Sequence, residues 1–546
     1  MKWWQKKAVF ECYPKSFLDT KGTGTGDLNG VRQKLGYLEE LGVSALWLTP
    51  VFTSPMVDNG YDVADYYNID PSYGTMEDME KLISEAKEHG IRIVMDFVFN
   101  HTSDQNKWFI ESKKDRTNPY ADWYIWCDAK PDGSAPTNWR GIFGGSAWTW
   151  CEERGQYYLH TFAAAQPDLN WANPEVRKEA AKICNFWCDK GVGGFRVDAI
   201  TYIRKPDEFK DGPVDAEDGS SAIHPLTANT PGILDYLHEF RDNVHGEDIF
   251  MVAEANGVAA EELPEWVGEH GVFDMLMEFS HVSLQFGNGE IWCRTTPWKL
   301  TDLKKAINAS QASTKDNGWY PIFFENHDQP RSISHYFPHQ SDKTGAAKVL
   351  GTLLYTLRGT PFIYQGEELG LDNVAWDDIA IYNDISSHGQ YEFALEEGFS
   401  EEEALSFVHD WSRDNARTPM QWNDETNAGF TTGTPWLPVH EDYAVQNAEV
   451  EDKDPDSVLN YYRRLAKLRE ECPVLVEGDY TSLLDDSETI FAYKRTCENG
   501  EAIILVNWTE EEQVYDASVE EGRGVLLSTG DHKAGVLGPH EAVILA

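Results

Sequence analysis

The sequence has few cysteines, few basic residues and no long apolar run. Its eight cysteines in 546 residues are scattered and include no CxxC pair, so neither a disulfide framework nor a zinc ribbon is indicated. Only 46 Lys and Arg stand against 92 Asp and Glu, and the resulting charge of −46 would repel nucleic-acid phosphates and anionic membrane surfaces. There is no apolar signal-peptide core at the N-terminus and no window near about 20 apolar residues. We therefore expect a soluble cytoplasmic protein with no nucleic-acid or membrane partner.

Short apolar runs alternate with amphipathic stretches along most of the chain, which is typical of a parallel sheet wrapped by helices. The predicted strands are 9–13, 45–49, 92–97, 194–198, 249–254, 275–278, 322–326 and 361–364. The predicted helices include 31–41, 76–89, 174–190 and 457–469. Eight strands without a glycine-rich dinucleotide turn after the first favour a closed (β/α)8 TIM barrel over an open doubly wound sheet.

Two segments depart from this alternation. Residues 101–172 are rich in tryptophan, glycine, proline and asparagine and contain no long periodic helix, so they predict a domain inserted after the third strand. Residues 471–546 alternate with period two around Asp and Gly turns, which predicts a C-terminal antiparallel β-sandwich. The catalytic barrel would then consist of residues 1–100 and 173–470.

Polar side chains gather where the predicted strands end, the position of active sites in barrels of this kind. They are Asp96, Asn100 and His101 after the third strand, Arg196 and Asp198 at the fourth, Glu254 at the fifth, and Asn326, His327 and Asp328 at the seventh. Any one of them alone is more often a helix N-cap or a solvated turn residue. Arg196 precedes Asp198 by two positions on the same strand face, where it can hold that carboxylate ionised.

These clusters also carry a family resemblance. DFVFNH (96–101), GFRVDAI (194–200), VAEA (252–255) and FFENHDQPR (323–331) resemble, in order and spacing, the four signature regions of the α-amylase superfamily of glycoside hydrolases. VFTSPMVDNGYDVADY (51–66), QPDLNW (166–171) and SRDNARTPMQW (412–422) resemble its oligo-1,6-glucosidase and α-glucosidase branch. The resemblance implies a cofactor-free enzyme that acts on small oligosaccharides, and we expect a monomer or homodimer.

The resemblance also implies catalytic roles. Asp198 would be the nucleophile, Glu254 the general acid/base, and Asp328 would bind the 2- and 3-hydroxyls of the sugar, with His101 and His327 donating to hydroxyls in the same subsite. A retaining glycosidase needs its two carboxyl groups about 5–5.5 Å apart. The acid needs a raised pKa, and the nucleophile an unshifted or lowered one.

Further residues would set the length and linkage of the substrate. By resemblance, Asp58 and Arg413, rather than Arg417, would close the pocket beyond the non-reducing sugar, and Tyr61 would stack on that sugar. A valine after the nucleophile goes with α-1,6 cleavage in this branch. This chain has the smaller Ala199, which leaves room on the aglycone side and favours α-1,4 linkages.

Several alternatives remain open from sequence. They are an oligo-1,6-glucosidase, a hydrolase of sucrose or trehalose 6-phosphate, and a glucosyltransferase. A phosphorylated substrate would need a cationic clamp; the excess acid argues against one, although Arg204, Lys205 and Lys299 lie near rim loops. A non-catalytic, sugar-binding or transporter-associated homologue is disfavoured because Asp198, Glu254 and Asp328 are all present and the sequence shows no membrane span.

The first loop departs from a calcium-binding pattern that the resemblance would lead one to expect. Family members often carry an aspartate-rich DxNxDGxGD loop, whereas Lys21 and Thr23 replace two of its oxygen-rich positions between Asp19 and Asp27. An ammonium cannot ligate a cation, and we expect Lys21 to pair with one of the two aspartates instead. The sequence therefore predicts no bound metal.

Overall fold

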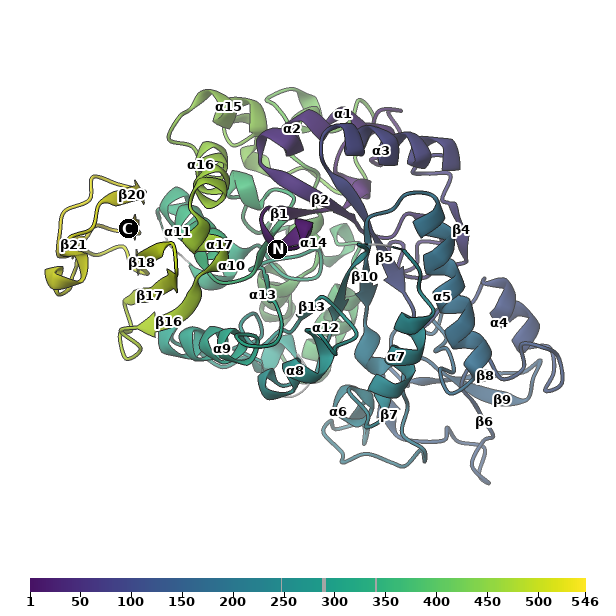
Figure 1. Ribbon diagram of the computed structural model, residues 1–546. Coiled ribbons are helices and arrows are strands. Elements are labelled where there is room, and N and C mark those ends of the chain that lie inside the picture. Colours follow the sequence, from purple (N-terminus) through teal and green to yellow (C-terminus); the bar gives the residue numbers. More distant parts are fainter. Residues whose placement is uncertain (247, 287–290, 339–340) are drawn as a thin grey trace.

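The computed structural model describes residues 1–246, 248–286, 291–338 and 341–546. Its centre is an eight-stranded parallel sheet made of β1 Ala8–Cys12, β2 Val43–Leu48, β5 Arg92–Val98, β10 Gly194–Asp198, β12 Phe250–Glu254, β13 Met275–Met277, β14 Pro321–Ile322 and β15 Thr360–Tyr364. The spatial order is β13, β12, β10, β5, β2, β1, β15, β14, and the two end strands contact each other. The predicted barrel is therefore confirmed (Figure 1).

The strands are buried on both faces, which explains why they read as apolar runs rather than as alternating patterns. Every residue of β1 and β2 is buried. The register matters for function: Val197 pairs with Ala253, so the next residues of the two strands, Asp198 and Glu254, end side by side. The predicted seventh strand is shorter than expected, because β14 stops at Ile322 and the polar cluster follows in a loop.

Helices wrap the barrel, and local sequence signals explain where they begin. Thr75 and Asp78 cap α3 reciprocally, and Asn173 caps α5 just before a proline in its first turn. The predicted helix 31–41 is two short helices that meet at Lys34, whose backbone leaves the helical region. The helices are α1 Leu28–Gln33, α2 Leu35–Glu40, α3 Met76–Glu88, α4 Lys107–Ser112, α5 Pro174–Asp189, α6 His224–Thr227, α7 Ile233–Asp242, α8 Leu263–Trp266, α9 Leu300–Ser313, α10 Ser332–Tyr336, α11 Lys343–Thr356, α12 Ile385–Glu396, α13 Glu401–Trp411, α14 Asp414–Arg417, α15 Ala448–Lys453, α16 Val458–Glu471 and α17 Pro473–Glu477.

The chain between β5 and α5 forms small sheets that lie beside the barrel (Figure 1). Their strands are β6 Trp126–Cys127, β7 Trp139–Arg140, β8 Trp148–Cys151 and β9 Gln156–Leu159, while β3 Phe52–Thr53 and β4 Asp65–Ile69 form a hairpin next to the second barrel strand. β7 pairs in parallel with β11 Ser221–Ala222, which lies outside the predicted insert. The loop after β10 is thus tied to the inserted region.

The C-terminal part is an antiparallel sheet with alternating faces. It contains β16 Asp479–Leu483, β17 Ile490–Cys497, β18 Gly500–Asn507, β20 Val525–Ser528 and β22 Ala542–Leu545, with β19 Gln513–Val514 and β21 Val536–Leu537 as a second small sheet. Phe491 and Tyr493 join the barrel core, whereas Ile490 and Ala492 pack with Leu537 of the small sheet. This period-two burial is the reason the segment was recognisable as strands.

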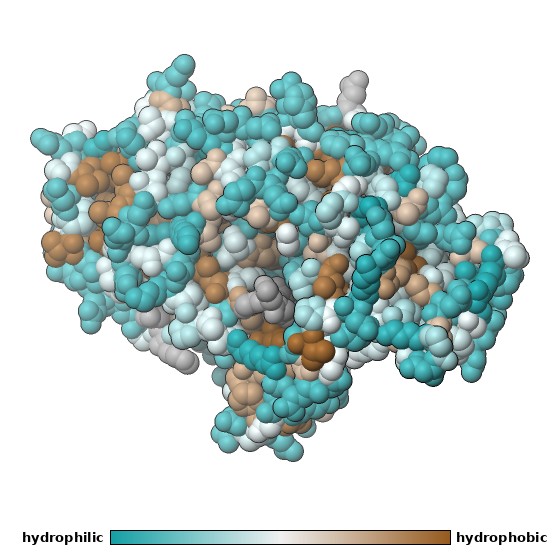
Figure 2. Space-filling model, turned by 90° about the horizontal axis from the view of Figure 1, so that it is seen from below, coloured by the Kyte–Doolittle hydropathy of each residue, from teal (hydrophilic) through white to brown (hydrophobic). Residues whose placement is uncertain are grey.

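Hydrophilic residues cover most of the face drawn in Figure 2, as the many charged residues of the sequence lead one to expect. Within the described part of the chain, no helix is long and apolar enough to cross a membrane.

Candidate active site

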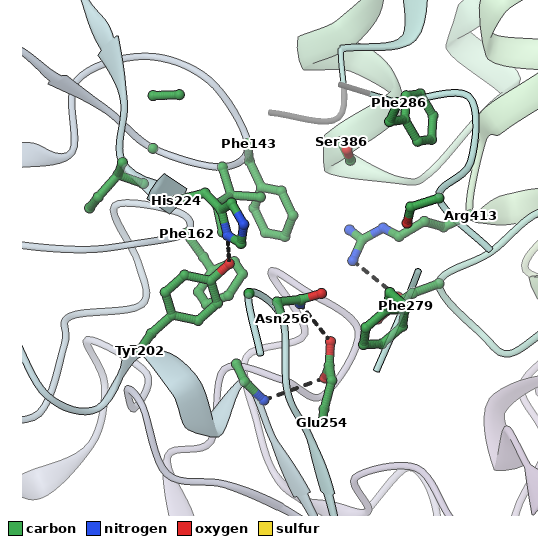
Figure 3. A pocket seen from close by; sticks show the side chains of 18 of the residues that line it. Phe143, Phe162, Tyr202, His224, Glu254, Asn256, Phe279, Phe286, Ser386 and Arg413 are labelled. Atoms are coloured by element: carbon green, nitrogen blue, oxygen red, sulfur yellow. Dashed lines mark hydrogen bonds and ion pairs between the residues drawn. The ribbon is translucent and has the colours of Figure 1, made fainter. Parts of the chain in front are cut away.

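A pocket of about 430 Å³ opens at the carboxyl ends of the barrel strands. Its lining combines charged side chains, such as Glu254 and Arg413, with aromatic ones, such as Phe143, Phe162 and Phe286 (Figure 3). Eight of the ten site residues predicted from sequence line it: Asp58, Tyr61, His101, Asp198, Ala199, Glu254, Asp328 and Arg413. The other two, Arg196 and His327, are buried beside it and bonded to residues of that set.

Arg196 organises the inner end of the pocket. Its Nη1 lies 2.7 Å from Oδ1 of Asp198 and 2.8 Å from Oδ1 of Asp96, and its Nη2 donates to Glu254. The guanidinium is 1% exposed and lies over the ring of Trp47. Because Asp198 and Glu254 bond to the same guanidinium, the two carboxyl groups are held together at the bottom of one cavity.

The protonation of this cluster differs from the sequence-based expectation. A lowered or unshifted pKa was expected for Asp198, but burial raises its pKa, and the neighbouring carboxylates of Glu254 and Asp96 add to the rise. Arg196 opposes the change, yet its single charge is divided among three carboxyl groups. Burial and the two neighbouring carboxylates therefore favour the protonated form of Asp198, opposite to the expectation for this residue.

His327 forms a second buried charged group. Its Nδ1 lies 2.5 Å from Oε1 of Glu11, and its Nε2 lies 3.2 Å from Oδ2 of Asp328. Burial works against the charged ring, but the two carboxylates raise the pKa of His327 to about 9. The imidazolium in turn lowers the pKa of Asp328 despite burial, with help from Arg413 and Arg417. Among the described residues, the partner of Nε2 is thus the carboxylate of Asp328, which itself lines the pocket.

The far end of the pocket is closed by ion pairs. Nη2 of Arg413 lies 3.1 Å from Oδ1 of Asp58 and 2.5 Å from Oδ1 of Asp384. Nη1 of the same arginine lies 3.3 Å from Oδ1 of Asp328. Arg417 sits deeper, with Nη2 2.6 Å from Asp328 and Nε donating to the carbonyl of His327. The structure thus places Arg413, rather than Arg417, against Asp58.

Tyr61 and His101 form one wall of this end. Tyr61 donates to Oδ2 of Asp96 at 2.8 Å and stacks parallel to His327 with ring centroids 5.1 Å apart. His101 is fully buried, and its Nε2 lies 3.0 Å from the carbonyl oxygen of Tyr61 and 3.1 Å from Nε2 of Gln166. Burial lowers the pKa of His101, so the ring is neutral. Its Nε2 is therefore occupied by protein groups.

Comparison with known proteins decides the family. Residues 11–478 match the model described as the alpha amylase catalytic domain. The chain belongs to the α-amylase family. It is therefore a glycoside hydrolase, as its signature regions predicted.

Relatives in this family cover nearly the whole chain. The chain is 41% identical over 535 residues to an oligo-1,6-glucosidase of Parageobacillus thermoglucosidasius, with 97% of this chain and 95% of that protein covered. It is 40% identical to a trehalose-6-phosphate hydrolase of Bacillus subtilis (strain 168), with 99% and 98% covered. The crystal structure of an isomaltulose synthase from Protaminobacter rubrum superposes with a TM-score of 0.95 at 38% identity, covering 100% of this chain and 99% of that one.

The three basic residues that the sequence placed near the rim are bonded to other protein groups. Nζ of Lys205 is buried 2.7 Å from Asp168, and Lys299 pairs at the surface with Glu488. Arg204 donates to Pro231 and Tyr236. None of the three is among the described residues that line the pocket of this α-amylase family member.

The loop expected to lack a metal is filled by hydrogen-bond donors. The carboxylate of Asp19 accepts from the backbone of Lys21, Gly22 and Gly24 at 2.8, 2.9 and 2.7 Å and from Thr431 at 2.6 Å. Donors rather than lone pairs face this carboxylate, so the residues present do not fit the calcium site of the family. The expected pairing of Lys21 with an aspartate is wrong, because its Nζ reaches the carbonyl of Ser72 at 3.3 Å.

Sequence reasoning missed several residues of the site. Glu11 is an acid inside an otherwise apolar strand, a signal that was readable. Asp384 and Gln390 come from the long excursion after β15, and His224 is the first residue of α6, in the connection that follows β10. The connection after the eighth strand, residues 372–411, is expected from sequence to overhang the pocket, but no motif in it singles out Asp384 or Gln390.

Proposed function

We propose that the chain is a retaining, exo-acting α-glucosidase that releases glucose from the non-reducing end of short α-glucosides. The observation that carries this proposal is the closed far end of the pocket, where Arg413 bridges Asp58 and Asp384. A chain of sugars cannot pass such a wall. One glucose therefore fits between the wall and the pair formed by Asp198 and Glu254.

In the proposed mechanism Asp198 attacks the anomeric carbon and the bond to the leaving oxygen breaks. Glu254 gives its proton to that oxygen, and a glucosyl-enzyme ester remains. Glu254 then takes a proton from water, whose oxygen attacks the anomeric carbon and frees Asp198. The charged pair of His327 and Asp328 supports this role, since it offers a donor and acceptors to the hydroxyls of the same sugar.

We propose α-1,4 linkages as the preferred substrates, because Ala199 lines the aglycone side and is small. Its backbone is left-handed (φ 44°), and its N–H lies 3.4 Å from Oε2 of Glu254, next to the place where the bond breaks. The alternative is α-1,6 cleavage, which is the activity in the names of several relatives. Both alternatives use the same catalytic residues.

A phosphorylated aglycone is less well supported. The pocket-lining arginines within the described residues are already paired: Arg140 with Asp215 at 2.8 Å, and Arg413 with the acids of the closed far end. The eight cysteines are all free thiols, which fits a reducing cytoplasm. We propose that the enzyme works there as a monomer or homodimer.

Initial rates on maltose, isomaltose, sucrose and trehalose 6-phosphate, measured side by side as released glucose, test this proposal. Maltose well ahead of the others would support α-1,4 specificity. Isomaltose well ahead would keep the mechanism but refute the argument from Ala199. Trehalose 6-phosphate well ahead would refute the neutral-aglycone argument, and no glucose from any of them would refute the function.

A further inference from the structure

One wall of the pocket holds a polar pair that the mechanism does not use. The hydroxyl of Tyr202 is hydrogen-bonded to Nδ1 of His224 (Figure 3). Tyr202 comes from the short 3-10 helix Ile200–Tyr202 that follows the nucleophile, and His224 opens α6. Both line the pocket, although they are 22 positions apart in the sequence.

The pair is held in place from both sides. Phe162 packs against Tyr202 edge to face, with centroids 5.9 Å apart, and Phe162 also contacts His101 at 5.1 Å. On the other side β11 ends two residues before His224 and pairs in parallel with β7, which ties the histidine to the inserted region. The imidazole therefore has a fixed position between the glucose subsite and the pocket mouth.

The free edge of the imidazole faces the turn that follows the catalytic acid. A methyl group on Gly257 would lie 3.7 Å from Cε1 and 3.9 Å from Nε2 of His224. The preceding residue, Asn256, is held by Glu254, since its Nδ2 lies 3.2 Å from Oε1 of the acid. The Nε2 edge is thus aimed at the side of the cavity where the leaving sugar must sit.

The chemistry of the pair favours one tautomer. A phenol is the better proton donor to a neutral imidazole, so the Tyr202 hydroxyl donates to Nδ1 and the ring proton resides on Nε2. Burial lowers the pKa of His224, which keeps the ring neutral. An N–H donor at this place suits a sugar hydroxyl. Around it the wall is aromatic and aliphatic, with Phe143, Phe162 and Ile223.

We propose that His224, oriented by Tyr202, donates a hydrogen bond from Nε2 to a hydroxyl of the leaving sugar and so selects a sugar over an apolar aglycone. This proposal rests on the glucosidase function proposed above. It makes His224 a specificity-determining residue and Tyr202 a positioning residue.

The test compares maltose and isomaltose with 4-nitrophenyl α-glucoside, whose aglycone offers no hydroxyl. We expect His224→Phe, which keeps a flat ring but lacks the donor, to lower the ratio of kcat/KM for the disaccharides to kcat/KM for the nitrophenyl glucoside about fivefold or more. His224→Gln restores a side-chain donor and should recover part of the ratio. Tyr202→Phe removes the group that favours this tautomer and should lower the ratio in the same direction by less.

The control is His270→Ala, since this exposed histidine is not among the residues that line the pocket. An equal loss on all substrates in His224→Phe, or an unchanged ratio, would overturn the proposal. If that variant does not fold, the ratios of Tyr202→Phe and His224→Gln decide in the same way. Failure of the parent enzyme to cleave the nitrophenyl glucoside would instead refute the proposed function.

Discussion

At the scale of single residues, the most consequential feature is one arginine that serves three carboxyl groups. Arg196 bonds to Asp96, Asp198 and Glu254 at once, in a site that is almost completely shielded from water. One positive charge cannot balance three negative ones, and burial raises the pKa values of both Asp96 and Asp198. Asp198 and Glu254 are therefore electrostatically coupled through one guanidinium.

Substitution separates the two roles. Asp198→Ala should lower kcat on every substrate by about ten-thousandfold or more, because no ester can form. Glu254→Gln should strongly lower kcat on maltose. It should leave the rate of the first step on 2,4-dinitrophenyl α-glucoside nearly unchanged, because that leaving group needs no proton. Stopped-flow release of dinitrophenol measures that step. Glu261→Gln, an exposed acid seven residues along, is the matched control. Equal losses of Glu254→Gln on both substrates would disprove its assignment as the acid.

The charged state of His327 predicts the alkaline side of the pH profile. Its pKa of about 9 comes from Asp328 and Glu11, so kcat/KM should fall as pH rises through about 9, where the donor to the sugar loses its charge. Glu11→Gln removes one of the two carboxylates and should move this limb to lower pH. The measurement is kcat/KM for 4-nitrophenyl α-glucoside against pH.

The control for Glu11→Gln is Glu39→Gln, which removes the carboxylate 2.6 Å from Nδ1 of the surface residue His89. That variant should leave the limb in place. If the alkaline fall of kcat/KM occurs at the same pH in Glu11→Gln as in the parent enzyme, the charge of His327 does not cause it.

At the scale of the elements, α15 carries a carboxylate that is costly to ionise. Glu451 is 8% exposed and accepts a hydrogen bond from the backbone of Leu459 at 3.0 Å, and burial raises its pKa to about 8. Between the unfolded pKa near 4.5 and this value, the folded protein binds more protons than the unfolded chain. Stability therefore falls as pH rises through this window, by up to about 1.4 kcal/mol per pH unit for this group.

Glu451→Gln should remove that contribution. Relative to the parent, the variant should gain Tm progressively from pH about 5 to pH about 8, with little further gain above it. Differential scanning calorimetry across this range checks the slope. Glu449→Gln is the matched control, since Glu449 lies on the same helix and is 56% exposed beside Lys453. A Tm difference that does not change with pH would contradict the account.

The elements also show what the sequence could and could not predict. Strands such as β2 and β10 were predictable because both of their faces are buried, which leaves uninterrupted apolar runs. The break between α1 and α2 was not, because one non-helical residue at Lys34 interrupts an otherwise continuous pattern. The wall formed by Tyr202 and His224 depends on the pairing of β7 with β11, a long-range contact between two-residue strands. Such short strands leave almost no periodic signal.

For the site, sequence could predict the residues at strand ends, since the closure of the barrel brings those ends to one rim. It could not predict Asp384, which completes the closed wall from an excursion of the chain that has no counterpart in the barrel repeat. Nor could it predict the raised pKa of Asp198, because a pKa depends on the degree of burial and on neighbours from other strands.

At the scale of the whole molecule, the charge of −46 dominates. Surface acids repel one another in the compact state, and salt screens this repulsion as the Debye length shrinks from about 30 Å at 0.01 M to about 3 Å at 1 M. We expect Tm to rise by several degrees over about that range of NaCl. Glycine betaine at equal osmolality is the control, because glucose is the proposed product and would bind the site. A Tm that falls with NaCl would show that the ion pairs outweigh the repulsion.

The central claim is that Asp198 and Glu254 hydrolyse an α-glucoside by double displacement. Proton NMR of the glucose first released from 4-nitrophenyl α-glucoside tests it most directly, because only the transferred sugar gives the signal. Two inversions restore the starting configuration, so the account predicts α-glucose first, followed by slow mutarotation. Initial appearance of β-glucose would mean a single inversion by water and would contradict the assignment of Asp198 as the nucleophile.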